Sequence, residues 1–207
     1  MGPLLFLICI NDLIVCCEIY SEIYLFADDA KLFHYILHAS DHCLLQSGIN
    51  ELRDWTKNWL LKININKCKV LSVGRDVGKN NTHSTIDNNK PHSHITLQYS
   101  SQCKDLGVLI DEKLNFSDHV HEQINKAYSM VGIIKRNFKY LNIQCFTLLY
   151  NSMVRSHLDY CSSVWNPYHK GDIEAVEKVQ KRATTKILPE LKHHKLSFPN
   201  RCLFNNM

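Results

Sequence analysis

The sequence predicts an α+β protein in which a β-rich first part is followed by an all-helical second part. Before residue 114, short β-prone runs alternate with turn residues. After it, apolar residues recur every three or four positions, which is the period of a helix. A composition of 45% hydrophobic and 21% charged residues over 207 positions is typical of a globular chain that buries a core. We therefore expect one or two compact units.

The first elements are an apolar run and a hairpin. Residues 4–10 suit a buried helix and a buried strand equally well, because a short apolar run carries no decisive period. Two β-prone runs within 23–36 flank a small polar centre, which predicts a hairpin with Asp28 and Asp29 at its tip. We expect the bend to be held still by burial of the residues before it, Tyr24, Leu25 and Phe26.

A core-facing helix follows, capped by Ser40 or Asp41. Its predicted apolar stripe is Leu45, Ile49, Leu52, Trp55 and Trp59. Short strands are expected at 69–73 and 95–99, on either side of a polar span, 76–94, that predicts a surface loop.

The remaining elements are a hairpin and three helices. KDLGVLID (104–111) alternates apolar residues around a glycine and predicts a tight hairpin that runs to about Leu114. Ser117 is expected to cap a helix with the apolar face Val120, Ile124, Ala127, Val131, Ile134 and Phe138. A second helix is predicted near 144–157, with Phe146, Leu149, Met153 and Val154 on its apolar face. A third starts at Asp172, buries Ile173, Val176, Val179, Ala183 and Ile187, and ends at Pro189.

Charge and cysteine usage narrow the function classes. Residues 1–113 hold 11 Lys and Arg against 13 Asp and Glu, whereas residues 114–207 hold 13 against 7. A basic half favours a phosphate-backbone partner, although it also suits a solvated surface. The apolar opening has no basic leader and meets Asn11 and Asp12 early, so we expect no signal peptide and no membrane anchor. Nine cysteines then predict free thiols in a reducing compartment, cytoplasmic or nuclear.

Most metal and nucleophile patterns are missing from the sequence. The chain has 12 histidines but no Cys-x-x-Cys, so no zinc motif is supported. No spacing pairs a cysteine with a histidine base, and no glycine loop of the phosphate-cradling type is present. Asp28 and Asp29 remain as the chemical signal. Two adjacent carboxylates are common in turns, but at a hairpin bend they can lean toward one spot, and their hard oxygens suit Mg²⁺ or Mn²⁺.

Five segments in one order carry a family resemblance: GPLLFLICINDL, YLFADDAKLF, INELRDWTKNWL, ININKCKVL and KDLGVLIDEKLNF. In this order the chain resembles reverse transcriptases of non-long-terminal-repeat retrotransposons, particularly jockey-like elements. Three later segments continue the resemblance: SDHVHEQINKAYSMVGIIKR, LLYNSMVRSHLDYCSSVWNP and IEAVEKVQKRATTKI. The resemblance implies a C-terminal fragment, from the end of polymerase motif B through motifs C, D and E to a thumb-like region. It assigns 1–113 to a partial palm, an antiparallel sheet with packing helices, 114–189 to a helical thumb-like region and 190–207 to a tail.

The resemblance also implies roles for individual residues. Asp28 becomes the principal ligand of catalytic Mg²⁺ or Mn²⁺, and Asp29 its weaker companion. Lys67 matches the family lysine near the phosphates of the incoming nucleotide. The turn of the second hairpin matches the primer grip that seats the primer end, through Leu106, Gly107 and Val108. Glycine at that turn permits close approach of backbone to nucleic acid.

The implied partners are an RNA template, a DNA primer and deoxynucleotides, with no membrane. Another metal-binding aspartate of the family precedes the GPLLF segment and has no match here, so we expect the isolated chain to be inactive. Two alternatives stay open, a non-catalytic nucleic-acid binder and an inert transposon-derived protein. Salt-dependent binding would separate these two alternatives. The candidate phosphate contacts are Lys135, Arg136, Lys139, Lys181 and Arg182, with Lys126, Lys178 and Lys186 as further basic residues.

Overall fold

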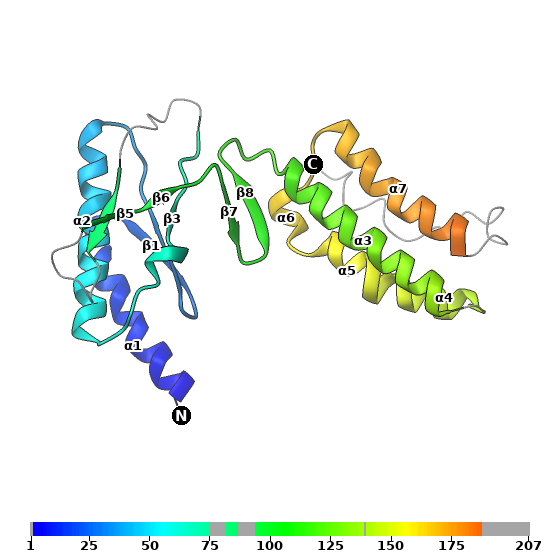
Figure 1. Ribbon diagram of the computed structural model, residues 1–207, viewed down its shortest axis with the longest axis horizontal. Helices are drawn as coiled ribbons and strands as arrows, with labels where there is room; N and C mark the ends of the chain where they lie inside the picture. Colours follow the sequence, from blue (N-terminus) through cyan, green and yellow to red (C-terminus); the bar gives the residue numbers. More distant parts are fainter. Residues whose placement is uncertain (1, 75–81, 87–93, 139, 188–207) are drawn as a thin grey trace. The chain divides into compact units, whose positions relative to one another are not determined.

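The chain forms a mixed arrangement of helices and small β-pairs, and its two compact units are Met1–Ser101 and Gln102–Met207 (Figure 1). The computed structural model describes residues 2–74, 82–86, 94–138 and 140–187, with only the backbone of 186 and 187. The described residues contain both α-helices and β-strands, which confirms the expected mixture of the two. None of the helices in the described ranges is both long and apolar enough to span a membrane.

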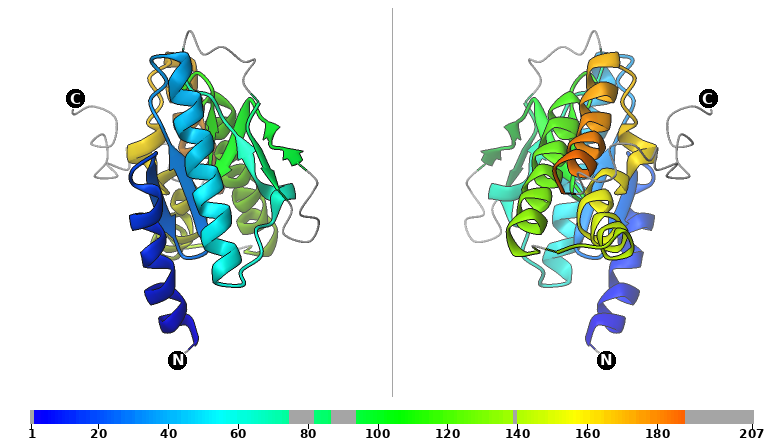
Figure 2. Two further views of the ribbon diagram at one scale, coloured as in Figure 1. Left: turned by 90° about the vertical axis from the view of Figure 1, so that its left-hand side faces the viewer. Right: turned by 90° about the vertical axis from the view of Figure 1, so that its right-hand side faces the viewer.

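The first unit begins with helix α1 (Gly2–Cys17), which settles the ambiguous apolar run in favour of a helix. Its buried residues are Ile10, Leu13 and Cys17, spaced three and four apart as on one helix face. Burial, and then the neighbouring Cys16, raise the pKa of the Cys17 thiol to about 11. These side chains meet Trp55 of α2 (Ala39–Asn58), and the two helices lie beside the first hairpin (Figure 2).

Helix α2 confirms the predicted core-facing helix but begins earlier than expected, because His38 is its N-cap. Asp41 occupies the third helical position, where its Oδ2 accepts the backbone N–H groups of His38 at 2.7 Å and Leu37 at 2.8 Å. These hydrogen bonds lower the pKa of Asp41. At the other end the predicted stripe runs one residue too far, since Trp59 lies beyond the helix and is 45% exposed.

The first hairpin pairs β1 (Glu22–Phe26) with β2 (Asp29–Phe33) in antiparallel register. Further along, the 3₁₀ turn η1 (Ile65–Lys67) precedes β3 (Lys69–Val70), which pairs in parallel with β6 (Gln98–Tyr99). Strand β4 (Ser84–Ile86) pairs antiparallel with β5 (His94–Thr96). The prediction of a loop throughout 76–94 was therefore wrong at 84–86, while 76–81 and 87–93 lie outside the described residues.

The predicted antiparallel palm sheet appears in the described residues as separate two-stranded pairs, one of them parallel. The predicted strand at 95–99 is divided at Leu97, whose N–H donates to the carbonyl of His83 at 2.8 Å, next to the β4–β5 pairing and before β6 begins. The predicted strand at 69–73 is shortened to two residues.

The second unit starts with the predicted second hairpin, β7 (Gln102–Asp105) and β8 (Val108–Asp111). Its helical segments are α3 (Ser117–Asn137), α4 (Ile143–Leu149), the π-helical turn η2 (Tyr150–Arg155), α5 (Ser156–Asp159), α6 (Ser162–Trp165) and α7 (Lys170–Ile187). The three predicted helical regions are thus confirmed. The hairpin groups with the helices, so the division falls before Gln102 rather than after residue 113.

Helix α3 is at the centre of this unit and has α7, η2 and α5 packed against it. Its predicted apolar residues Val120, Ile124, Ala127, Val131 and Ile134 are buried, but Phe138 lies past the helix end and is 43% exposed. Ser117 is the first helical residue rather than the cap, which is Phe116. The Ser117 hydroxyl donates instead to Asp172 Oδ2 at 2.9 Å and so joins the starts of α3 and α7.

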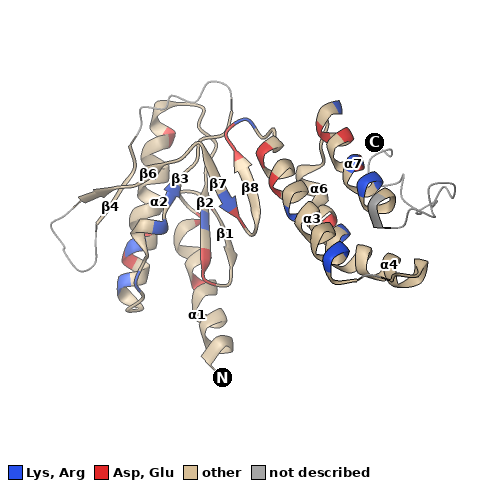
Figure 3. Cartoon of the chain, turned by 45° about the vertical axis from the view of Figure 1, so that its right-hand side comes forward, with Lys and Arg blue, Asp and Glu red and all other residues tan. Residues whose placement is uncertain are grey.

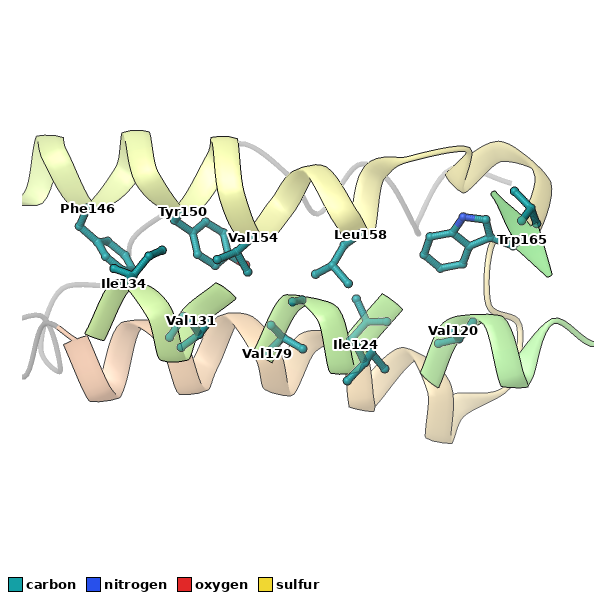
Figure 4. Packing of buried hydrophobic residues seen from close by; sticks show 14 residues of the cluster. Val120, Ile124, Val131, Ile134, Phe146, Tyr150, Val154, Leu158, Trp165 and Val179 are labelled. Atoms are coloured by element: carbon teal, nitrogen blue, oxygen red, sulfur yellow. The ribbon is translucent and has the colours of Figure 1, made fainter. Parts of the chain in front are cut away.

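The segment opposite α3 has a different period. Phe146, Tyr150, Val154 and Leu158 point toward α3 at a constant spacing of four (Figure 4). In an uninterrupted α-helix twelve residues make about 3.3 turns, so Leu158 would be rotated about 120° away from Phe146. The wider π turn between them takes up that rotation and keeps all four side chains in the core.

Candidate functional site

Asp28 and Asp29 lie at the reversal of the first hairpin, as predicted. Ala27 and Asp28 form the two-residue turn, and Asp29 opens β2 opposite Phe26. Both carboxylate residues are exposed. Ala27 has φ 52°, a left-handed conformation that is unfavourable for a residue with a Cβ. The fold therefore presents two neighbouring carboxylates to solvent at one tight turn.

The side chains that anchor the hairpin to the core are not all the ones we expected. Tyr24 is 56% and Phe26 60% exposed, so the predicted burial of these two rings was wrong. Successive strand residues point to opposite faces, and it is Ile23 and Leu25 that pack on the unit's core. The Tyr24 hydroxyl donates to Glu22 Oε2 at 2.7 Å on the outer face.

The aspartate pair has no third ligand nearby among the described residues, where no group of three or more His, Cys, Asp or Glu could hold a metal ion. Two carboxylates supply hard oxygen ligands for one divalent cation, with water in the other positions. Two-metal phosphoryl transfer requires more negative charge than this to hold both cations.

Lys67 is the last residue of η1, and it is exposed. Its backbone N–H donates to the Asn64 carbonyl at 2.9 Å, which closes the 3₁₀ turn. Within the described part of the chain, no hydrogen bond or ion pair joins Lys67 to Asp28 or Asp29. Lys67 is thus an exposed cation of the same unit that does not contact the aspartate pair in the described structure.

The turn of the second hairpin consists of Leu106 and Gly107, with φ values of 44° and 89°. Two positive φ values in a two-residue loop are those of a type I′ turn, which fits the twist of paired strands. Val108 is 5% exposed and belongs to the core of the second unit, so its side chain is not part of the surface.

Tyr160, which sequence reasoning missed, covers this turn. Its hydroxyl donates to the Leu106 carbonyl at 2.7 Å. A Cβ at Gly107 would lie 3.3 Å from the Tyr160 ring. The glycine thus permits close approach of an aromatic ring of the same chain. No local signal reveals this contact, because the two residues are far apart in the sequence.

The predicted phosphate-contacting residues lie on α3 and α7. Lys135 and Arg136 are exposed in the last turn of α3, and Lys181 and Arg182 are exposed on α7. The guanidinium carbon of Arg182 lies 5.0 Å from the centre of the Tyr128 ring, a cation–π contact. Lys139 and the side chain of Lys186 are outside the described residues.

The two basic groups belong to one end of the bundle because α3 and α7 run parallel. Ser117 meets Asp172 at the starts of these helices, and Tyr128 meets Arg182 further along. The C-terminal halves of both helices carry Lys and Arg and no Asp or Glu, whereas Asp and Glu lie in the N-terminal halves, together with Lys126, Lys170 and Lys178 (Figure 3). Such a distribution also complements the helix dipoles, so it does not by itself require a ligand.

Two further basic residues are already paired. Lys126 lies 2.8 Å from Glu122 Oε1, and this contact, together with Lys104, lowers the pKa of Glu122. Lys178 lies 3.9 Å from Glu174 Oε2, with both side chains well exposed. These lysines are weaker candidates for phosphate contacts than Lys135 and Arg136.

Comparison with known proteins finds two proteins that are distantly similar to this chain. The chain is 24% identical to a probable RNA-directed DNA polymerase from the transposon BS of Drosophila melanogaster, over 88% of this chain and 21% of that protein. It is also 27% identical to an uncharacterized protein of Caenorhabditis elegans, over 51% of this chain and 54% of that protein. The chain thus spans about half of one relative and about a fifth of the other. No family model matches the chain, and no solved structure matches it.

Proposed function

We propose that this chain is part of a reverse transcriptase of a non-long-terminal-repeat, jockey-like retrotransposon. The observation that carries the proposal is the exposed two-carboxylate turn, Asp28 and Asp29, in a chain distantly similar to a transposon RNA-directed DNA polymerase. In this proposal 1–113 contributes to the palm and 114–189 to the thumb. The substrates are an RNA template, a DNA primer and deoxynucleotides.

The proposed chemistry places a divalent cation on Asp28, with Asp29 as a weaker ligand. A cation held there would supply charge stabilisation for the attacking primer hydroxyl and the leaving pyrophosphate. Lys67 is the proposed partner of nucleotide phosphates, as an exposed ammonium group in the same unit. The β7–β8 turn and the basic ends of α3 and α7 are the proposed contacts with primer and template.

We further propose that the 207 residues alone do not polymerise DNA. The support is the missing third ligand, since the described residues hold no group of three that could bind a metal ion. Loss of one ligand costs several kcal/mol of transition-state stabilisation, and each 1.36 kcal/mol is about tenfold in rate. Primer extension with Mg²⁺ and with Mn²⁺ should therefore give no template-dependent product. Synthesis by the purified chain would contradict this part of the proposal.

Metal binding at the turn is tested separately from activity. Mn²⁺ added to isotope-labelled chain should broaden the backbone amide signals of residues 27–30 first, because a paramagnetic ion relaxes the nearest nuclei most. Asp28→Asn should abolish this broadening and Asp29→Asn should weaken it. Asp12→Asn is the matched control, since Asp12 is an exposed carboxylate of the same unit on α1 rather than on the hairpin. Broadening that survives Asp28→Asn would place the ion elsewhere.

Nucleic-acid binding distinguishes the polymerase fragment from the inert alternative. Fluorescence anisotropy should show binding to an RNA–DNA primer-template that weakens steeply with salt. Lys135→Gln with Arg136→Gln should lower the slope of log K against log salt by up to about 2, since each lost phosphate contact removes about 0.9. Lys57→Gln with Lys62→Gln removes the same charge from exposed positions of the first unit and should leave the slope unchanged. Equal slopes in all three proteins would rule out the α3 contacts.

A further inference from the structure

Two histidines from distant parts of the sequence meet in the first unit. His42 lies in the first turns of α2, and His83 directly precedes β4. Their ring centroids are 5.6 Å apart and the ring planes are inclined by 34°. This pair has no part in the proposed polymerase chemistry.

Both imidazoles are at least partly shielded from solvent, and one buried ring nitrogen has no hydrogen-bond partner among the described residues. His83 is 5% exposed. The Nδ1 atom of His42 is buried and has no hydrogen-bond partner among the described residues. A buried polar atom without a partner costs about 1–3 kcal/mol. Such an atom in a folded protein points to a bound ion or an ordered water.

The separation of the two rings is built into the fold. Gln46 lies one turn after His42 on the same face of α2. Its side-chain amide donates to the Ser84 carbonyl at 2.7 Å, and its Oε1 accepts the Ser84 N–H at 3.0 Å. The backbone next to His83 is therefore fixed to the helix that carries His42.

We propose that His42 and His83 form a two-histidine site for a late first-row divalent cation, Zn²⁺, Ni²⁺ or Cu²⁺. Two imidazoles on one tetrahedral ion, each nitrogen about 2.0–2.1 Å from the metal, place their ring centroids about 5–6 Å apart. The observed separation of 5.6 Å lies within this range. Imidazole is a preferred ligand of these ions, whereas Mg²⁺ prefers oxygen.

The remaining coordination positions belong to water, because the described residues offer no third His, Cys, Asp or Glu to this pair. The ligand form of histidine is the neutral ring. Burial, and then the neighbouring His42, lower the pKa of His83, so this ring is neutral at pH 7. The unfilled Nδ1 of His42 would gain the partner that the protein alone does not give it.

The experiment measures the urea unfolding of the full chain with and without Zn²⁺ or Ni²⁺. An ion that binds only the folded state lowers the unfolding equilibrium constant by the factor 1 + [ion]/Kd, which is about a hundredfold at 100 times Kd. His42→Gln and His83→Gln should each remove this effect. His42 is only half buried, so its variant is the one expected to fold normally if His83→Gln does not.

Two controls separate this site from others. Replacing both His121 and His169 by Gln removes two exposed imidazoles of the second unit and should leave the stabilisation by Zn²⁺ unchanged. Asp28→Asn with Asp29→Asn should also leave it unchanged, so the fate of this site is independent of the proposed polymerase site. The proposal is overturned if Zn²⁺ and Ni²⁺ give no stabilisation, or if the His42→Gln chain is stabilised as much as the natural one.

Discussion

Ala27 has a left-handed backbone at the turn that presents Asp28 and Asp29. This conformation costs a non-glycine residue about 1–2 kcal/mol, part of which a glycine recovers. Ala27→Gly should therefore raise the free energy of unfolding by up to about 1 kcal/mol, as measured by urea denaturation. Ala30→Gly is the matched control in β2 and should lower it by about 0.5–1 kcal/mol. Destabilisation by both changes would mean that Ala27 is not strained.

His119 couples the stability of the second unit to pH. It is fully buried, and its Nδ1 accepts the Leu109 N–H at 3.2 Å. Burial lowers its pKa, so folding favours the neutral ring. The stabilisation is complete above the ordinary pKa of about 6.5 and is lost as the pH falls through the lowered folded pKa.

We thus expect the free energy of unfolding of this unit to decrease between pH 7 and pH 5. Trp165 lies 5.4 Å from the His119 ring, so its fluorescence reports this transition. His119→Gln should flatten the pH dependence, whereas His121→Gln, at an exposed position of the same helix, should retain it. A steeper fall in the His119→Gln chain would contradict the assignment.

Single residues were predictable from sequence where a local pattern fixed them. Asp28 and Asp29 were placed correctly at a turn because small and polar residues interrupt two β-prone runs. The exposure of Tyr24 and Phe26 was not predictable, because alternation does not say which strand face meets the core. The His42–His83 contact joins distant segments, and no spacing rule encodes it.

At the scale of elements, the β7–β8 hairpin depends on Tyr160. Tyr160→Phe removes the hydroxyl that donates to the Leu106 carbonyl but keeps the ring over Gly107. We expect a loss of about 0.5–1.5 kcal/mol, the usual net value of one hydrogen bond. Faster hydrogen exchange of the hairpin amides should accompany this loss. Tyr140→Phe, at a side chain that is 97% exposed, should change neither quantity.

The elements differ in how far sequence determines them. The 3–4 spacing of α3 specifies one helix face and was recovered almost completely. The region of α4, η2 and α5 was predicted as helical, but its π turn was not, since that turn arises from packing against α3. Strands of two residues, such as β3 and β6, are too short to show alternation.

At the scale of the whole molecule, the two units have separate cores. Phe146 is fully buried in the second, so Phe146→Ala should destabilise that unit by about 3–5 kcal/mol. Leu148→Ala, on the same helix at a residue 71% exposed, should stay within about 0.5 kcal/mol. The fluorescence of Trp165 should show the second unit unfolding at a lower urea concentration. The fluorescence change of Trp55, in the core of the first unit, should keep its midpoint. A shared transition would show that the units unfold together.

The position at which the chain divides into two units was not predictable from the sequence. The change of period near residue 114 correctly predicts that the described elements after it are helices, although α1 and α2 lie before it. The compact units divide before Gln102 instead, because Val108 of the hairpin is buried with α3 and α7. A hairpin belongs to whichever core its inner face reaches, and local periodicity carries no information on that.

The π turn has a consequence for natural length variation. Leu158 comes twelve positions after Phe146, and the wide turn absorbs the surplus over whole α-helical turns. A homologue one residue shorter within 150–155 would span about three regular turns over the same stretch, so both flanking side chains would keep their places. Single-residue gaps are therefore tolerable here, whereas the same gap inside α3 would rotate half of that helix out of phase with its neighbours.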